Sequence, residues 1–326
     1  MSVLVTGASG FTGKALVKRL LKDGENVIAL VRNPNTSSDI EALGAKLVAG
    51  NVKDKGSIEK AIKDVQTVYH IAALFREAGH PDSEYWKVNV EGTKNVLDAS
   101  IKAGVKRFVH CSTIGVCGHI ANPPADETAP YNPHDIYQRT KMEGEKLALK
   151  YAKEGKLPVV VARPASIYGP GDLRLLKMFR LIKKKLFVVL GNGKRFFHMV
   201  YIDDLVDGFL LCAKKDNIIG EVFILAGEKY FTQNNIFATI AEELGVKPPW
   251  IYLPAKPFQI LGALIEKACV PFGIEPPLHR RRVDFYTMTR AFNIDKAKRI
   301  LGYSPKFDLR TGIKNTAEWY KQQGLL

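Results

Sequence analysis

The sequence predicts an α/β protein in which a doubly wound parallel sheet is followed by a smaller C-terminal lobe. Three observations support this prediction. Six short apolar runs rich in Val, Ile and Ala recur in the first half of the chain, helical patterns separate them, and the alternation ends near residue 166. Continuous apolar runs are typical of strands that are buried on both faces, and strands that alternate with helices form parallel sheets with right-handed crossovers.

The expected strands are, in order, SVLVTG (2–7), NVIALVR (26–32), AKLVAG (45–50), VQTVYHIAA (65–73), KRFVHCS (106–112) and LPVVVARPA (157–165). Between the first two strands, Leu16, Leu20 and Leu21 form one helical stripe and Gly24 ends the helix. Beyond residue 166 isolated units remain, which are a helix at 202–215, a strand at 221–227 and a helix at 232–245. We therefore expect residues 1–165, with a late segment near 196–225, to form the sheet domain.

Residues 166–326 would then form mainly a substrate-binding lobe. Within this part, the apolar segment FQILGALIEKACVPF (258–272) is interrupted by Glu266 and Lys267. It fits either a helix of the lobe or an anchor at a membrane interface.

The composition limits the class of protein. A chain of 326 residues with 46% hydrophobic content can bury a large core. No apolar run reaches the length of a membrane span, and the first residues do not resemble a signal peptide, so we expect a cytoplasmic protein. The four cysteines, Cys111, Cys117, Cys212 and Cys269, lack CxxC spacing, which favours reduced thiols, and no metal site is expected.

The net charge of +15 is concentrated in the second half, where residues 166–326 carry 25 basic and 15 acidic side chains against 23 and 18 before them. The segment 174–195 contains eight Lys or Arg residues and no acid. Such a run fits an anionic ligand, a membrane surface or a solvated helix face. No nucleic-acid-binding motif accompanies it, so we do not expect nucleic acid as a partner.

The turn TGASGFTG (6–13) follows the first strand and opens the first helix. Gly7 allows a tight turn, Gly10 lets a pyrophosphate approach the backbone, and Gly13 lets the helix pack on its strand. The N–H groups around Ser9, Phe11 and Thr12 and the helix dipole favour phosphate. This pattern predicts a Rossmann-type dinucleotide-binding domain.

The end of the second strand indicates which dinucleotide is bound. An NAD-binding protein places an acid there to accept a hydrogen bond from the ribose 2′-OH, whereas this chain has Val31 followed by Arg32. A guanidinium can hold a 2′-phosphate through two hydrogen bonds, so NADP is preferred over NAD in this prediction.

Residues 137–141 read YQRTK, which places Tyr137 and Lys141 on one face of a helix. Seven segments, this one included, occur in the order typical of one family: TGASGFTG (6–13), HIAA (70–73), NVEGTKNVLDAS (89–100), CSTIGVCG (111–118), YQRTK (137–141), RPASIYGPGD (163–172) and HMVYIDDLVDG (198–208). Together they resemble the extended short-chain dehydrogenase/reductases, also called the NAD-dependent epimerase/dehydratase group.

The resemblance implies an enzyme in which Tyr137 is the general acid or base and Lys141 favours its phenolate and holds the nicotinamide ribose. Thr113 would hydrogen-bond the substrate oxygen, with Ser112 as the alternative. The further cofactor contacts would be Asn51, Val52, Ala72, Ala73, Pro164, Ser166 and Ile167, beside Arg32 and the glycine turn. Cys117 stands where the family commonly has tyrosine, and Asn51 where many relatives have aspartate.

The resemblance also bears on the substrate. Ser166 stands where enzymes acting on nucleotide sugars commonly have asparagine, and the wording of several segments is closer to the 3β-hydroxysteroid dehydrogenase and dihydroflavonol reductase branch. We therefore expect an NADP(H)-dependent oxidoreductase that interconverts a secondary alcohol and a ketone on a small, apolar, sterol-, terpenoid- or flavonoid-like substrate. The alternatives are a nucleotide-sugar epimerase or dehydratase with tightly bound NAD, and a non-catalytic NADP-binding sensor or assembly protein. Peripheral membrane contact is possible in this interpretation, and family members often form homodimers through the helices expected at 84–104 and 135–154.

Overall fold

The structure, a computed structural model, describes residues 2–75, 80–269 and 280–326. Its centre is a seven-stranded sheet with the strand order β11-β6-β5-β4-β1-β2-β3. All neighbouring strands in this sheet are parallel. The strands are β1 Ser2–Thr6, β2 Asn26–Val31, β3 Lys46–Ala49, β4 Thr67–His70, β5 Arg107–Cys111, β6 Val159–Pro164 and β11 Val222–Leu225. The predicted doubly wound parallel sheet is confirmed.

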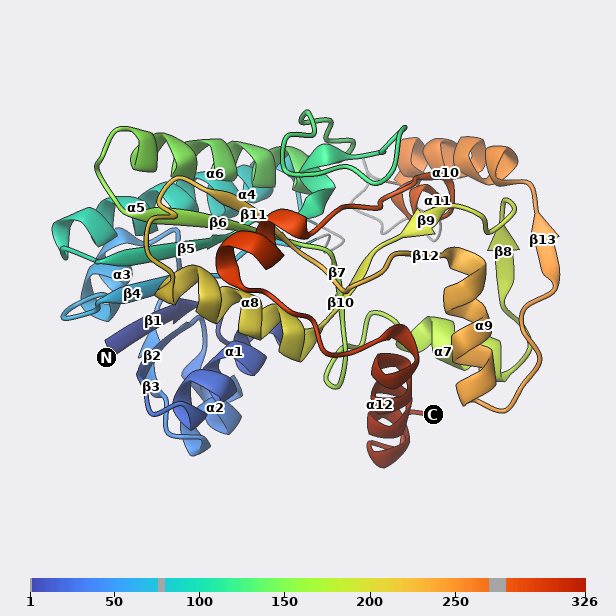
Figure 1. Ribbon diagram of the computed structural model, residues 1–326, viewed down its shortest axis with the longest axis horizontal. Coiled ribbons are helices and arrows are strands. Elements are labelled where there is room, and N and C mark those ends of the chain that lie inside the picture. Colours follow the sequence, from blue (N-terminus) through green and yellow to red (C-terminus); the bar gives the residue numbers. More distant parts are fainter. Residues whose placement is uncertain (1, 76–79, 270–279) are drawn as a thin grey trace.

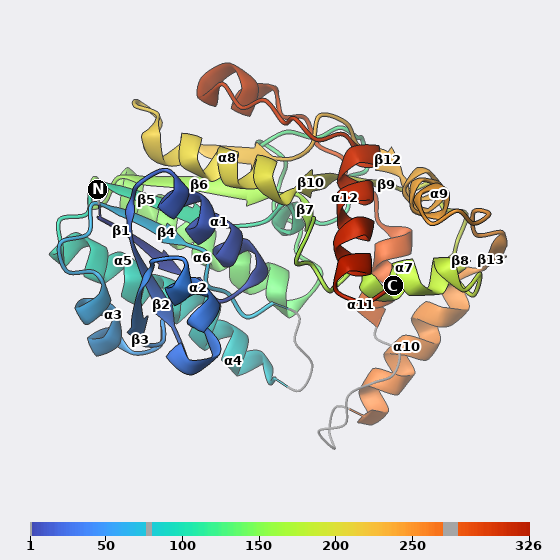
Figure 2. The ribbon, with the colours of Figure 1, turned by 90° about the horizontal axis from the view of Figure 1, so that it is seen from below.

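Helices cover both faces of the sheet (Figures 1 and 2). One face carries α1 (Phe11–Lys22), α2 (Ser38–Ala42) and α8 (Ile202–Lys214), and the other carries α3 (Lys55–Ala61), α5 (Gly92–Lys102) and α6 (Ile136–Lys153). Alternate side chains of β1 enter the two cores, because Val3 and Val5 belong to the first and Leu4 to the second. The short helix α4 (Asp82–Trp86) continues through a π-helical turn at Lys87–Glu91 into α5.

The second lobe lies at the carboxyl edge of the sheet, on the right of Figure 1. It contains three small strand pairs and five helices among the described residues. The pairs are β7 (Ser166–Tyr168) with β10 (Met199–Tyr201), β9 (Phe196–Phe197) with β12 (Phe231–Thr232), and β8 (Val188–Leu190) with β13 (Ile251–Leu253). The helices are α7 (Leu176–Lys183), α9 (Gln233–Glu243), α10 (Ala255–Cys269), α11 (Arg280–Thr287) and α12 (Leu309–Gln322). Between these pieces the chain returns to the sheet through α8 and β11.

The apolar segment expected at 258–272 is helical as far as Cys269, and its last three residues lie outside the described part of the chain. Helix α10 protrudes from the body of the molecule (Figure 2). Ile260, Leu261 and Leu264 are exposed on it, so the helix belongs to the lobe without burying its apolar side chains. Within the described residues, no helix combines the length and the apolar character that crossing a bilayer requires.

Candidate functional site

The glycine turn at residues 6–13 joins β1 to α1. Gly7 has φ of +72°, a conformation that side chains disfavour, and a Cβ there would lie 2.7 Å from the backbone nitrogen of Ala72. A Cβ on Gly13 would lie 2.1 Å from the Gly7 carbonyl oxygen. On Gly10 a Cβ would meet only that same oxygen, at 3.4 Å. Gly7 and Gly13 are therefore needed for packing, whereas glycine at position 10 keeps the outer side of the turn open.

The N-terminus of α1 lies uncapped at this turn. No side chain accepts a hydrogen bond at the cap residue Gly10, and the first intrahelical bond runs from the Lys14 N–H to the Gly10 carbonyl at 2.8 Å. The N–H groups of Phe11, Thr12 and Gly13 consequently have no acceptor within the described residues, and Ser9 beside them is exposed. Open N–H groups at a helix N-terminus suit the pyrophosphate of a dinucleotide, so these residues fit such a cofactor.

The end of β2 lies next to this turn. Val31 is buried and Arg32 is exposed, and Arg32 makes neither an ion pair nor a hydrogen bond in the described part of the chain. The nearby Lys14 is engaged by Asp39 at 2.8 Å. Arg32 thus offers an unpaired guanidinium at the position where the adenosine ribose is expected.

Tyr137 and Lys141 lie in the first two turns of α6, as the spacing predicts. The Tyr137 ring is largely buried and packs edge-on against Phe75, with ring centroids 4.9 Å apart. Leu74 and Tyr85 complete this apolar cluster. The Lys141 ammonium is fully buried and donates a hydrogen bond of 2.6 Å to the carbonyl oxygen of Cys111 at the end of β5. Burial lowers the pKa of Lys141, and two of its N–H groups are left to bind a ligand.

The hydroxyls of Ser112 and Thr113 have different partners. Ser112 is buried and donates to the carboxylate of Glu145, which also forms a buried ion pair with Arg163 at 2.6 Å. Thr113 is half-buried, and its hydroxyl oxygen accepts the Gly115 N–H at 3.0 Å. A hydroxyl that accepts through its oxygen still has its hydrogen to donate, so Thr113 is better suited than Ser112 to bind a substrate oxygen.

Asn89 is a site residue that the sequence analysis did not single out. Its buried amide accepts the Leu74 N–H at 2.7 Å and donates to the Leu74 carbonyl and to the Thr140 hydroxyl, at 3.2 and 3.0 Å. It lies in the π-helical turn between α4 and α5, and π-helical turns often occur at functional sites. Asn89 therefore ties the segment after β4 to the helix that carries Tyr137 and Lys141.

Arg174 is a second such residue. Its guanidinium carbon lies 5.5 Å from the ring centre of Phe11, in the cofactor turn, and 5.6 Å from that of Phe75, in the wall around Tyr137. The buried Asp172 holds it through a hydrogen bond of 2.7 Å. This arginine therefore connects the second lobe both to the glycine turn and to the apolar cluster around Tyr137.

The remaining predicted cofactor residues follow strands of the sheet at its carboxyl edge, where ligands of open α/β sheets bind. They are Asn51 and Val52 after β3, Ala72 and Ala73 after β4, and Pro164, Ser166 and Ile167 at the end of β6 and in β7. The Asn51 side chain accepts the Lys53 N–H at 3.0 Å, and the Ser166 N–H donates to the His198 carbonyl at 3.1 Å. Their contact with a cofactor stays a prediction.

Comparison with known proteins identifies the family. The model of the NAD dependent epimerase/dehydratase family matches residues 3–226. The chain belongs to this family. Its 3β-hydroxysteroid-dehydrogenase/decarboxylase relative from Arabidopsis thaliana is 33% identical, over 97% of this chain and 78% of the relative. The decarboxylating sterol-4-alpha-carboxylate 3-dehydrogenase of Candida albicans is 30% identical, over 98% of both chains.

Among solved structures, MoeE5 in complex with UDP-glucuronic acid and NAD has a TM-score of 0.78 and 26% identity, covering 99% of this chain and all of that one. Relatives in this family thus include sterol dehydrogenases and proteins that bind nucleotide sugars. The prediction of an NAD(P)-dependent enzyme of the extended short-chain dehydrogenase/reductase type is confirmed, whereas the preference for NADP and the substrate are not decided by these relatives.

Proposed function

We propose that this enzyme is an NADP(H)-dependent oxidoreductase that interconverts a secondary alcohol and a ketone on a hydrophobic, sterol-like substrate. The observation that carries the proposal is the apolar surround of Tyr137. Leu74, Phe75 and Tyr85 pack around this tyrosine, while Lys141, one helical turn further along α6, is fixed by the Cys111 carbonyl. An apolar wall beside a proton donor suits a hydrophobic ketone better than a polyhydroxylated sugar.

The residues divide the chemistry between them. The nicotinamide of the bound cofactor supplies or accepts the hydride. Tyr137 gives a proton to the substrate oxygen during reduction and takes it back during oxidation, and the Thr113 hydroxyl donates a hydrogen bond to the same oxygen. Lys141 stabilises the phenolate by its charge and binds the ribose through its remaining N–H groups.

The preference for NADP rests on Arg32. Its side chain is exposed and unpaired in the described part of the chain, and the preceding Val31 supplies no carboxylate to repel a 2′-phosphate or to bind a 2′-OH.

The first experiment measures binding of NADPH and NADH by nicotinamide fluorescence. We expect tighter binding of NADPH, and a loss of about 10- to 100-fold in NADPH affinity for Arg32→Ala, because a charged hydrogen-bonded pair contributes about 1.5–3 kcal/mol. NADH binding should not change. Arg299→Ala, which removes another exposed arginine, is the matched control. Tighter binding of NADH by the unmodified enzyme would overturn the cofactor proposal.

The second experiment follows NADPH oxidation with hydrophobic ketones of increasing size, including 3-oxosteroids. Tyr137→Phe should lower kcat by about 100-fold or more while leaving NADPH binding intact, since general acid catalysis contributes 10²–10⁴-fold. A biological effect that survives Tyr137→Phe would favour the non-catalytic sensor or assembly role.

A nucleotide-sugar epimerase or dehydratase with bound NAD is the second candidate. A polar hollow is bordered by His119, which follows β5, and by Asn192, Lys194 and Arg195 of the second lobe, and its cationic side chains could hold a diphosphate. Uridine or thymidine diphosphate should then raise the Tm, and Arg195→Ala should abolish that rise. No response to either nucleotide would remove this candidate.

We also propose that the enzyme is cytoplasmic and contacts a membrane surface. We further propose that it forms a homodimer through α5 and α6. Helices α5 and α6 lie side by side on one face of the sheet, joined by the hydrogen bond of 2.6 Å from the Tyr151 hydroxyl to Asp98. On the adjoining helical surface, Trp86 and Ile101 are partly exposed. Light scattering of the purified enzyme tests the dimer, and Trp86→Glu should yield monomers if this surface is buried in it.

A further inference from the structure

The end of the second lobe that lies farthest from the Rossmann sheet exposes several large apolar side chains. It is formed by the turn at residues 183–187, the segment 247–253 and helix α10, which lie at one end of the molecule in both views (Figures 1 and 2). We call it the β8–β13 end, after the strand pair at its centre. Leu186 is 63% exposed and Trp250 is 77% exposed there. Tryptophan that exposed is unusual, because its large apolar ring is normally covered.

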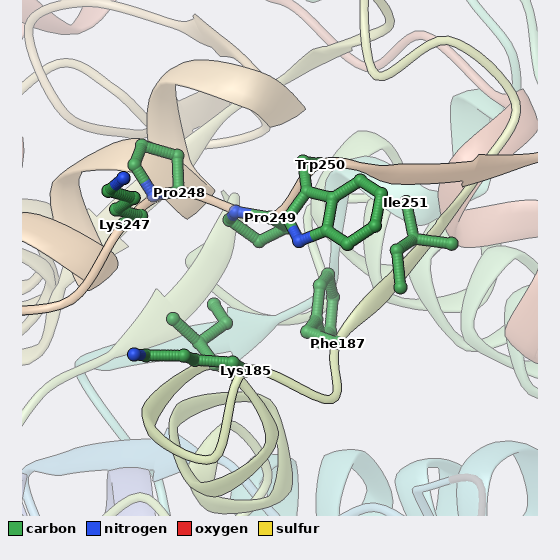
Figure 3. Close-up of a pocket in the computed structure, with 8 residues that line it drawn as sticks. Lys185, Phe187, Lys247, Pro248, Pro249, Trp250 and Ile251 are labelled. Atoms are coloured by element: carbon green, nitrogen blue, oxygen red, sulfur yellow. The ribbon is translucent and has the colours of Figure 1, made fainter.

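A hollow lies between the turn at residues 183–187 and the segment 247–253 (Figure 3). Phe187 and Ile251 lie at its apolar side, next to the Trp250 ring, and the side chains of Lys185 and Lys247 extend from its opposite side. An exposed tryptophan beside lysines is the combination found where proteins meet the interfacial region of a bilayer.

The described charged side chains of this end are lysines. Lys183, Lys184, Lys185, Lys247 and Lys256 are all exposed, and none of them forms an ion pair among the described residues. The carboxylates of the neighbouring helix α9 are occupied elsewhere, since Glu242 pairs with Arg310 and Glu243 with Lys321. The surface therefore combines apolar side chains with free positive charge.

Helix α10 extends this surface. It starts directly after β13, and its exposed residues Ile260, Leu261 and Leu264 recur at the spacing of one helical face. Tyr252 and Leu253, both partly exposed, connect the Trp250 turn to this helix. Exposed apolar side chains therefore occur on all three elements of this end, from Leu186 to Leu264.

We propose that the β8–β13 end docks on an anionic lipid surface, with Trp250, Leu186 and the outer face of α10 entering the interface and the five lysines binding lipid phosphates. This proposal rests on the proposed function. A hydrophobic substrate dissolved in a membrane would enter the enzyme through the second lobe, which we expect to bind it. A second copy of the chain is a poorer occupant, since its own five lysines would face these in a symmetric contact.

The test is co-sedimentation of the whole purified chain with vesicles of phosphatidylcholine, with and without phosphatidylglycerol. We expect binding that needs phosphatidylglycerol and weakens as salt is raised. Replacing Lys183, Lys184 and Lys185 together by Gln should weaken it on the order of 100-fold, since each lysine near an anionic surface contributes about 1 kcal/mol, or about 5-fold. Trp250→Glu and Leu264→Glu, each made in the wild-type chain, should also reduce vesicle binding.

Controls separate this proposal from the proposed activity. Ile219→Glu changes another exposed apolar residue, which lies outside the β8–β13 end, and should leave vesicle binding unchanged. NADPH binding, measured on every variant, should stay unchanged as well. Equal sedimentation of wild type and Trp250→Glu, binding to phosphatidylcholine alone that the lysine variant retains, or a concentration-dependent dimer that Trp250→Glu dissociates would each overturn the proposal, whatever the enzyme reduces.

Discussion

Three buried histidines should make this protein less stable as the pH falls from 7.5 to 5. His70 lies beneath the site, between the Thr6 and Thr93 hydroxyls at 2.8 and 3.0 Å, and burial lowers its pKa to about 3. Burial lowers the pKa of His198 to about 4 and that of His110 well below its usual range. All three imidazoles are therefore neutral in the folded chain at pH 5, whereas histidines of the unfolded chain, with pKa near 6.5, are mostly protonated.

The sign follows from proton uptake. Because the folded-state pKa values lie below the unfolded value, the stability contributed by neutral imidazole is complete above about pH 6.5 and is lost as the pH falls toward the folded-state values. At pH 5 each histidine costs about 2 kcal/mol, since 1.5 pH units below pKa 6.5 correspond to about 1.4 kcal/mol per unit. A folded-state pKa of about 3 or about 4 gives the same figure, so His70 and His198 together cost about 4 kcal/mol, and His110 adds to the loss in the same direction.

Urea denaturation between pH 7.5 and 5 measures this loss, if the transition is two-state. His198→Gln should remove about 2 kcal/mol of the loss between pH 7.5 and 5. Burial raises the pKa of Glu127, Asp203 and Asp204, whose protonation acts in the opposite direction, but these carboxyls are common to all variants and cancel in the differences. A His198→Gln protein that loses as much stability as the wild type between pH 7.5 and 5 would refute the reasoning.

Three further predictions concern the site. Asn89→Ala leaves two buried backbone groups without partners and should lower the free energy of unfolding by about 2–4 kcal/mol, measured by urea denaturation, with a loss of activity that excess cofactor does not restore. Gly10→Ala should fold normally but weaken NADPH binding in a fluorescence titration, whereas Gly13→Ala should lower the Tm as well, because only its Cβ collides with backbone. Thr113→Val should lower kcat and also the Tm, because it removes the acceptor of the Gly115 N–H, whereas Ser112→Ala should lower mainly the Tm, because its hydroxyl binds a buried carboxylate.

Much of the fold could be predicted from local patterns. The six apolar runs became six strands, because a strand buried on both faces needs apolar side chains at every position. The glycine turn could also be predicted, since its backbone conformation depends mainly on residues close in sequence. Strand β11, which joins the sheet beside β6, was recognised as a strand and only loosely assigned to the sheet domain. Its sequence does not specify which strand it pairs with.

Residues whose roles depend on distant partners were not predicted. Asn89 acts through Leu74 and Thr140, 15 and 51 positions away, and no spacing rule connects them. Arg174 was counted only as part of a basic run, although its guanidinium lies over Phe11 from the other end of the site. The roles of both residues depend on contacts with side chains or backbone groups that are distant in the sequence. The π-helical turn at Asn89 could not be inferred from helical periodicity either.

The burial of Lys141 shows how the site and the stability of the fold are connected. Within the described part of the chain the ammonium donates to the Cys111 carbonyl, and its charge lowers the pKa of the neutral His70 and His110 nearby, after the larger effect of burial. No carboxylate forms an ion pair with it in the described part of the chain, because Glu145 is held by Arg163. Holding a cation in this environment costs stability that ribose hydroxyls would partly restore. Cofactor should therefore raise the Tm of the wild type by more than that of Lys141→Met, because the variant binds the cofactor more weakly.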